Sequence, residues 1–364
     1  MKQTNNAIKF LMAQYRAIFK NANIAMVAAM AAAALAAGQA QAATNQTLNN
    51  QGFKADSALN VTMTGDAGAD TAKNQYKNFT ITGDEGAKGF INTQENVLTV
   101  TGGKDDSGSV FTGKDNDKLS LIDLSNTVLN IAGAAGDQTA TVVKAGADDK
   151  SVDLRLKAVN LTKGTLQLGK EGGAKVASKL TANTITVGGD GPAELNAKKA
   201  AVITGTESIE VKKGGTIGLG IEAQLSGATL TVTDGALTLG DKSKVINSAI
   251  NVSGGTVTLS GKDNDNKSEL GNSSSNIKIT GGEVKVDGGK HGVITASSFT
   301  LSDKAKLTNS GSLAINTTGT LELSGGTIDN ADQKSLTFGN IDECQYKSRY
   351  KSSVCRTKTM NFET

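Results

Sequence analysis

The chain has little of what a compact enzyme core is usually made from. Its 364 residues include no Trp, one Pro, two Cys and one His, and aromatic residues make up only 4%. Large cores normally depend on aromatic side chains because each buries a large apolar area. Hydrophobic residues are 37% of the chain, below the roughly 45–50% typical of globular proteins. We therefore expect a core of Val, Ile, Leu and Ala.

The same shortages leave little for catalysis. The single histidine, His291, lies in a Gly-rich segment that we expect to be a turn, and no serine lies in a G-x-S-x-G elbow. Arg155 is the only arginine in the body of the chain. Several acidic residues are adjacent pairs, which would point to opposite faces of a strand. We expect no enzyme activity, no catalytic residues and no cofactor, with a polysaccharide-active β-helix enzyme as the alternative.

One sequence pattern recurs in the second half of the chain. It consists of a short strand of alternating apolar and polar residues, a Gly pair, and another short strand of the same kind. A clear copy is Ala249-Ile-Asn-Val-Ser-Gly-Gly-Thr-Val-Thr-Leu. Strand onsets are separated by 24, 21, 20, 27 and 22 residues, at Thr184, Ser208, Thr229, Ala249, Asn276 and Ser298. Recurrence of this kind marks a stacked repeat.

The period predicts an all-β fold, a parallel β-helix (β-solenoid) of about 20–27 residues per coil. Each coil would stack on the previous one at about 4.8 Å, with apolar side chains inside and polar ones outside. Gly would occupy corners that need positive φ or close backbone approach. A β-sandwich is the alternative, because frequent turn signals also suit that fold.

The spacing of the expected strands differs between two parts of the chain. We expect irregular N-terminal coils or a cap over residues 43–160, where strands are less evenly spaced, and a regular solenoid over residues 161–340.

The first 42 residues have the features of an extended signal peptide. Four cations precede an apolar run from Ile24 to Ala37, and Ala40 and Ala42 fit a small-residue cleavage site. The run is too short to span about 30 Å of hydrocarbon. We therefore expect export by the Sec route, and a net charge of −1 after removal of the four cations, Lys2, Lys9, Arg16 and Lys20.

The last segment, residues 341–364, differs from the rest. It contains no Gly but holds both cysteines, Cys344 and Cys355. The change of composition suggests a frameshift shortly after Gly339, with a short capping segment as the rival interpretation.

The pentapeptide Gly-Lys-Asp-Asn-Asp occurs at Gly113–Asp117 and at Gly261–Asp265. Alternating acids of this kind offer oxygen ligands to Ca²⁺, so Asp115, Asp117, Asp263 and Asp265 are weak metal candidates. No later Gly or distal Glu completes an EF-type loop. A solvated turn that was duplicated is the favoured interpretation.

The long basic leader that ends Gly38-Gln-Ala-Gln-Ala42, followed by Gly/Thr/Asn-rich strands with Gly-Gly corners, resembles a bacterial autotransporter passenger domain of the adhesin or self-associating type. The resemblance covers residues 1 to about 340. It rests on the leader, the composition and the strand pattern, without an invariant motif. It implies a right-handed β-helix, Sec-dependent export and display at the cell surface.

The chain departs from this family in its last segment. Such proteins end in an outer-membrane translocator barrel, and residues 341–364 do not resemble one. We expect a truncated passenger that reaches the surface, or is secreted, only with a separate translocator, and otherwise stays in the periplasm.

These features together predict a non-enzymatic adhesin-like module. Its partners would be host-cell or sister-cell surface molecules, possibly itself, contacted through a polar solenoid face. A secreted structural or matrix protein is a further alternative. Nucleic acid is not expected, because basic residues are neither in excess nor clustered.

Overall fold

The computed structural model describes residues 46–47, 54–55, 61–64, 75–76, 78–85, 90–92, 95–100, 109–133, 141–146, 149–170, 172, 175–189, 191–331, 334–339, 343–346 and 359–361. All of them lie in the second of two compact units, which begins at Gln46. The expected signal peptide, residues 1–42, lies outside the described residues. The described part is all-β, and no helix in it is long and apolar enough to cross a membrane.

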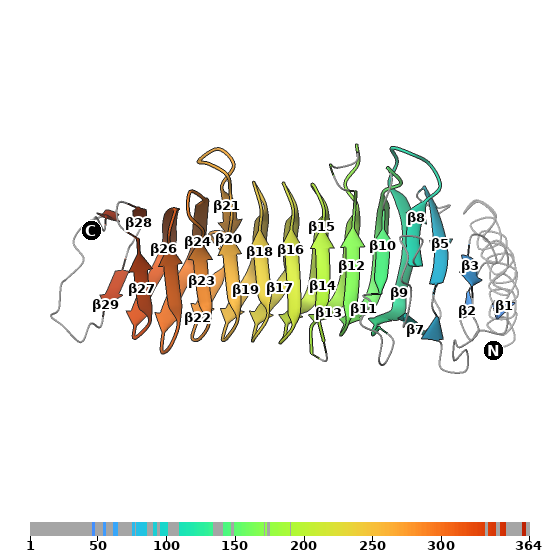
Figure 1. Cartoon of the computed structure of the whole chain (residues 1–364), viewed down its shortest axis with the longest axis horizontal. Helices are drawn as coiled ribbons and strands as arrows, with labels where there is room; N and C mark the ends of the chain where they lie inside the picture. Colours follow the sequence, from blue (N-terminus) through green and yellow to red (C-terminus); the bar gives the residue numbers. More distant parts are fainter. Residues whose placement is uncertain are drawn as a thin grey trace, which may run out of the picture. The chain divides into compact units, whose positions relative to one another are not determined.

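The strands form two parallel stacks that alternate along the chain (Figure 1). The short-strand sheet contains β8 (Ser109–Gly113), β10 (Val142–Ala145), β12 (Gly164–Leu168), β14 (Ala193–Ala197), β16 (Gly215–Leu219), β18 (Ala236–Leu239), β20 (Thr256–Leu259), β23 (Glu283–Val286), β25 (Lys306–Asn309) and β27 (Thr327–Asn330). The long-strand sheet contains β9 (Ser120–Ile131), β11 (Val152–Leu161), β13 (Lys179–Val187), β15 (Val202–Val211), β17 (Gln224–Val232), β19 (Lys244–Val252), β21 (Ser268–Leu270), β22 (Asn276–Ile279), β24 (His291–Ser302), β26 (Ser312–Ser324), β28 (Ser335–Gly339) and β29 (Glu343–Tyr346).

Each strand pairs in parallel with its equivalent one coil further along, which confirms the predicted β-solenoid. The six predicted onsets are direct register partners, in the order Thr184, Ser208, Thr229, Ala249, Asn276 and Ser298. The column continues to Thr320 in β26 and Glu343 in β29, and it begins earlier, with Val97 in β7 (Asn96–Val100), Val128 in β9 and Ala158 in β11. The β-sandwich alternative is wrong, because a sandwich is built from antiparallel pairs.

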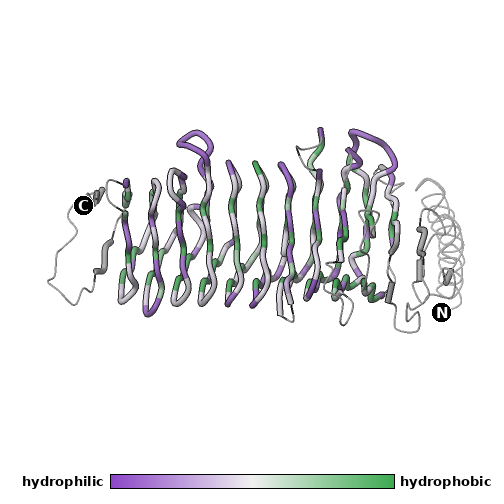
Figure 2. Tube along the Cα trace, viewed as in Figure 1, coloured by the Kyte–Doolittle hydropathy of each residue, from purple (hydrophilic) through white to green (hydrophobic). Residues whose placement is uncertain are grey.

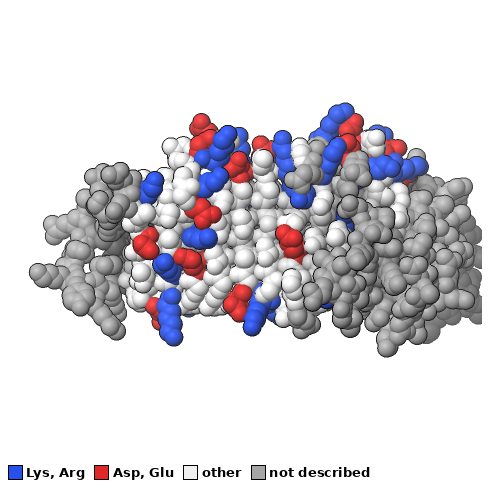
Figure 3. Space-filling model, in the orientation of Figure 1, with Lys and Arg blue, Asp and Glu red and all other residues white. Residues whose placement is uncertain are grey.

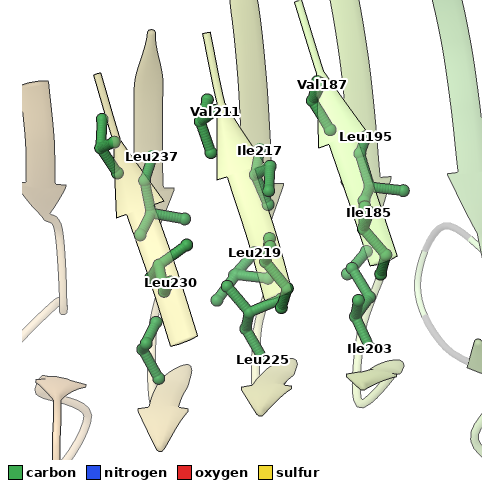
Figure 4. Close-up of a cluster of buried hydrophobic side chains, with 14 of the residues drawn as sticks. Ile185, Val187, Leu195, Ile203, Val211, Ile217, Leu219, Leu225, Leu230 and Leu237 are labelled. Carbon is green, nitrogen blue, oxygen red and sulfur yellow. The ribbon is translucent and has the colours of Figure 1, made fainter. Parts of the chain in front are cut away.

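The core is a set of aliphatic columns that run from coil to coil (Figure 4). Inward residues alternate with outward ones, as in β16, where Ile217 and Leu219 are buried and Thr216 and Gly218 are partly exposed. One column consists of Leu129, Val159, Ile185, Ile209, Leu230, Ile250, Ile277, Phe299 and Leu321, each no more than 1% exposed. The few aromatic residues include Phe111, Phe299 and Phe338, which are fully buried. Figure 2 shows hydrophilic residues concentrated in the upper loops.

The inward and outward alternation breaks in the middle of the long strands, as in β9 at Ser125 and Asn126 and in β15 at Thr206 and Glu207, where two exposed residues follow one another. We call this place the bend. The register shifts at this bend between Gly205 and Ser208 in β15 and between Ala182 and Thr184 in β13. The inner side of the bend is occupied in successive coils by Ala182, Gly205, Gly227 and Asn247.

The first strands pair less regularly than the coils that follow. β5 (Asn78–Glu85) is antiparallel to β3 (Val61–Thr64), parallel to β8 and, at its end, antiparallel to β9. β4 (Gln75–Tyr76) pairs with β7 (Asn96–Val100), and both β7 and β6 (Phe90–Ile91) pair with β9. β1 (Gln46–Thr47) and β2 (Lys54–Ala55) form a separate two-stranded sheet.

The start of the C-terminal segment continues the stack. β29 pairs in parallel with the second half of β26, so that Cys344 lies opposite Leu321. β30 (Thr359–Asn361) is antiparallel to β28. This antiparallel pairing ends the parallel ladder at the first half of the long strand. The frameshift hypothesis stays a prediction.

Asn247 is an unusual residue for the inside of the bend. Its side chain is fully buried, and neither amide atom has a hydrogen-bond partner among the described residues. A buried polar group without a partner costs about 1–3 kcal/mol. We expect Asn247→Ala to raise the free energy of unfolding by an amount of that order, measured by urea denaturation. A loss of stability would mean that the amide makes a compensating interaction.

Candidate functional site

The outward positions of the coils carry polar side chains that bond from one coil to the next. Asn160 donates to Asn130 at 2.9 Å, and Asn130 donates to Thr99 at 3.3 Å. On the first half of the long strand, the hydroxyls of Thr204 and Ser226 are 3.0 Å apart. These pairs are register partners, so the polar ladders follow directly from the stacking.

Ion pairs extend the same ladders. The Nζ of Lys244 lies 3.0 Å from Glu269, its register partner in the next coil. Lys306 lies 3.7 Å from Glu283 and 3.4 Å from Asp329, in the coils before and after it. Exposed pairs of this kind contribute only about 0–1 kcal/mol each. Their main consequence is a fixed pattern of charge on the outer surface.

The two Gly-Lys-Asp-Asn-Asp loops occupy equivalent positions in different coils. Gly113 and Gly261 each lie two residues after a buried residue of the short-strand sheet, Phe111 and Leu259. These two belong to one column, connected through Ala145, Leu168, Ala197, Leu219 and Leu239. Six coil steps separate the loops, or about 29 Å. Both connect the short-strand sheet to the long-strand sheet, along the edge where charged side chains gather in Figure 3.

Lysines hold the acidic residues of the first loop. Asp117 lies 2.6 Å from the Nζ of Lys175, and Asp115 lies 3.7 Å from that of Lys118. The hydrogen bond to Asp117 is the main cause that raises the pKa of Lys175. Asp117 has a φ of 61°, and its amide donates to the carbonyl of Asp149 in the next coil. The loop is thus tied to the neighbouring coil.

Asp263 closes the second loop. Its Oδ1 accepts hydrogen bonds from the amides of Asp265 and Asn266, at 3.0 and 2.9 Å, and from the side chain of Asn266 at 2.7 Å. His291, in the following coil, lies 3.0 Å from the Oδ1 of Asn264 through its Nδ1. The hydrogen bonds that Asp263 accepts from the amides of Asp265 and Asn266 form an Asx turn.

The hydrogen bonds of this turn lower the pKa of Asp263 below its ordinary 3.8, and the largest cause is the side chain of Asn266. We expect Asn266→Ala to raise the pKa of Asp263 back toward 3.8, as followed by the carboxyl carbon shift in NMR. Because the folded-state pKa is depressed, the turn is fully formed above about pH 3.8 and loosens as the pH falls through the lowered value. Lys262→Ala removes only a weaker Coulomb attraction and should shift the pKa less.

The four weak metal candidates do not come together. Asp115 and Asp117 lie six coils from Asp263 and Asp265, and no three ligating side chains gather anywhere in the described part of the chain. Calcium takes about six to eight oxygen ligands. The acids of the first loop face lysines, and Asp263 accepts amides of its own loop. The arrangement is that of two closed turns.

Arg155 and His291 are the two residues that a catalytic hypothesis would use. Arg155 lies 2.9 Å from Asp153 and 3.7 Å from Asp123, its partner in the preceding coil. The hydrogen bond to Asp153 is the main cause that raises the pKa of Arg155, which lowers the population of the neutral guanidine that a general base would need. His291 contacts an amide oxygen of the second loop.

One surface feature was missed from the sequence. The outward positions of β16, β18 and β20 hold small, uncharged residues: Thr216, Gly218, Ala236, Thr238, Thr256 and Thr258, of which Thr258 is only 9% exposed. We call this surface the threonine patch. The next outward charges on the same sheet are Glu194 in β14 and Glu283 and Lys285 in β23. Figure 3 shows a band without charged side chains in the middle of the view.

Comparisons of the chain with protein-family models, with curated proteins and with solved structures find no match.

Proposed function

We propose that this protein is an exported, non-enzymatic adhesin-like module, which adheres to cell surfaces or to copies of itself through the polar outer faces of its solenoid. The observation that carries the proposal is the outer surface: polar ladders repeat at about 4.8 Å along coils whose inner positions are almost entirely aliphatic. A surface of this kind makes many weak contacts at once, and affinity grows with the number of contacts engaged together.

Export, surface display and the partners belong to the same proposal. The basic leader supports export, and the resemblance to autotransporter passengers supports display with a translocator supplied by another protein. The partners are host-cell or sister-cell surface molecules, including a second copy of this chain.

Cell clumping tests the proposal. Residues 43–340 would be displayed on a non-clumping bacterium by fusion to a translocator, beside a matched strain that displays the translocator alone. We expect faster settling of the displaying cells, or their retention on host cells or matrix. Equal settling and equal retention of the two strains would refute the proposal. Loss of viscosity from a polysaccharide solution would instead support the enzyme alternative.

A further inference from the structure

The short-strand sheet presents a flat outer face whose residues fall into two columns. The first contains Val142, Thr165, Glu194, Thr216, Ala236, Thr256, Glu283, Lys306 and Thr327. The second contains Lys144, Gln167, Asn196, Gly218, Thr238, Thr258, Lys285, Thr308 and Asp329. The threonine patch lies in the middle, between Glu194 on one side and the charges of β23 and β25 on the other.

We propose that this face binds the same face of a second copy, with the two solenoids side by side, pointing in the same direction, and with each coil opposite its own equivalent. The inference rests on the proposed self-association and specifies its geometry. Symmetric pairs of identical chains use the same surface on both partners. A two-fold axis parallel to the solenoid axis places the first column of one copy over the second column of the other.

Charge complementarity supports this arrangement. On β23 it puts Glu283 of each copy over Lys285 of the other, which forms two reciprocal opposite-charge pairs. Within one copy, Glu283 contacts Thr308 and Lys306 through its Oε1, and Lys285 lies 3.2 Å from Asp287. In no coil from β10 to β27 does this arrangement place like charges opposite each other.

Side-chain size supports it as well. On β16, Thr216 of each copy meets Gly218 of the other, and on β18, Thr238 meets Ala236. On β18 the larger side chain therefore lies over the smaller one, as needed when two sheets interdigitate at about 10 Å. On β20 Thr256 meets Thr258, and on β16 the Oδ1 of Asn196 from the same copy lies beside Gly218. Few long side chains in the patch have to be ordered on association, which lowers its entropic cost.

The opposite arrangement, with antiparallel solenoids centred on β18, is disfavoured by charge. It places β14 of one copy over β23 of the other, so that Glu194 faces Glu283 at both ends of the patch. Like charges brought together at an interface disfavour association. The same strand, β18, distinguishes the two arrangements, because the antiparallel one brings Ala236 over Ala236 and Thr238 over Thr238.

Disulfide trapping tests the geometry in the full chain, with Cys344 and Cys355 replaced by Ser. We expect a mixture of Ala236→Cys and Thr238→Cys proteins to form the mixed disulfide under mild oxidation, well above either homodisulfide. Predominant homodisulfides would overturn the parallel geometry. No disulfide, while sedimentation still shows a dimer, would overturn the assignment of this face. A protein that sediments as a monomer at every concentration would overturn both this inference and the self-association beneath it, although adhesion to other cells would survive.

Charge reversal provides an independent test with a matched control. Glu283→Lys places two lysines over each other, and we expect it to raise the dimer dissociation constant about tenfold or more. The double exchange Glu283→Lys with Lys285→Glu restores the reciprocal pairs and should recover the affinity. Equal weakening by the single and the double variant would contradict the pairing.

Discussion

Leu230→Ala is expected to lower the free energy of unfolding by about 2–5 kcal/mol, because it leaves a cavity in a packed core. Leu230 is fully buried in β17, and its register partners are Ile209 in the preceding coil and Ile250 in the following coil. Single coils have no independent stability, so the cavity weakens the contact with both neighbours. Urea denaturation followed by circular dichroism measures the effect.

The matched control is Thr229→Ala, one residue away on the same strand. Thr229 points outward, and substitutions at such surface positions usually change stability by less than about 0.5 kcal/mol. Equal effects of the two substitutions would contradict the inward and outward alternation of β17.

Gly255→Ala is the second substitution with a large expected effect. Gly255 is the second member of a Gly pair and has a φ of 70°, and a Cβ there would lie 2.1 Å from the carbonyl oxygen of Gly235 in the preceding coil. The left-handed conformation costs a non-Gly residue about 1–2 kcal/mol, and forced overpacking adds about 1–3 kcal/mol. We expect a total loss of roughly 2–5 kcal/mol.

Gly289 separates the two causes. Its φ is 69°, but a Cβ would meet nothing within 4 Å. Gly289→Ala should therefore lose only the conformational part, about 1–2 kcal/mol, in the same denaturation experiment. If the free energy of unfolding falls by the same amount in both variants, the close stacking of Gly255 on Gly235 is wrong.

The coil register could be predicted from the sequence because two local signals coincide. Apolar residues at every second position identify the inward side chains, and the Gly pairs identify the corners where backbones of adjacent coils meet, as at Gly254 and Gly255. These signals recur within each coil, so the onsets from Thr184 to Ser298 could be aligned without a structure.

Other features could not be predicted, because they depend on how coils of different length align. The bend in the long strand carries no common residue type: Ala182, Gly205, Gly227 and Asn247 follow one another there. The threonine patch and the equivalence of the two Gly-Lys-Asp-Asn-Asp loops appear only when outward positions are compared across coils. Sequence spacing alone does not align them, because the loop at Gly261–Asp265 lengthens its coil.

The central claim is that the chain forms one continuous parallel stack whose side faces are available for contact. Distances between spin labels test it most directly, with Thr184→Cys paired in turn with Asn276→Cys, Ser298→Cys and Thr320→Cys in a chain lacking Cys344 and Cys355. These positions are four, five and six coils from Thr184. The stack predicts separations that rise in equal steps, at about 19, 24 and 29 Å. Separations that do not increase with coil number would contradict it.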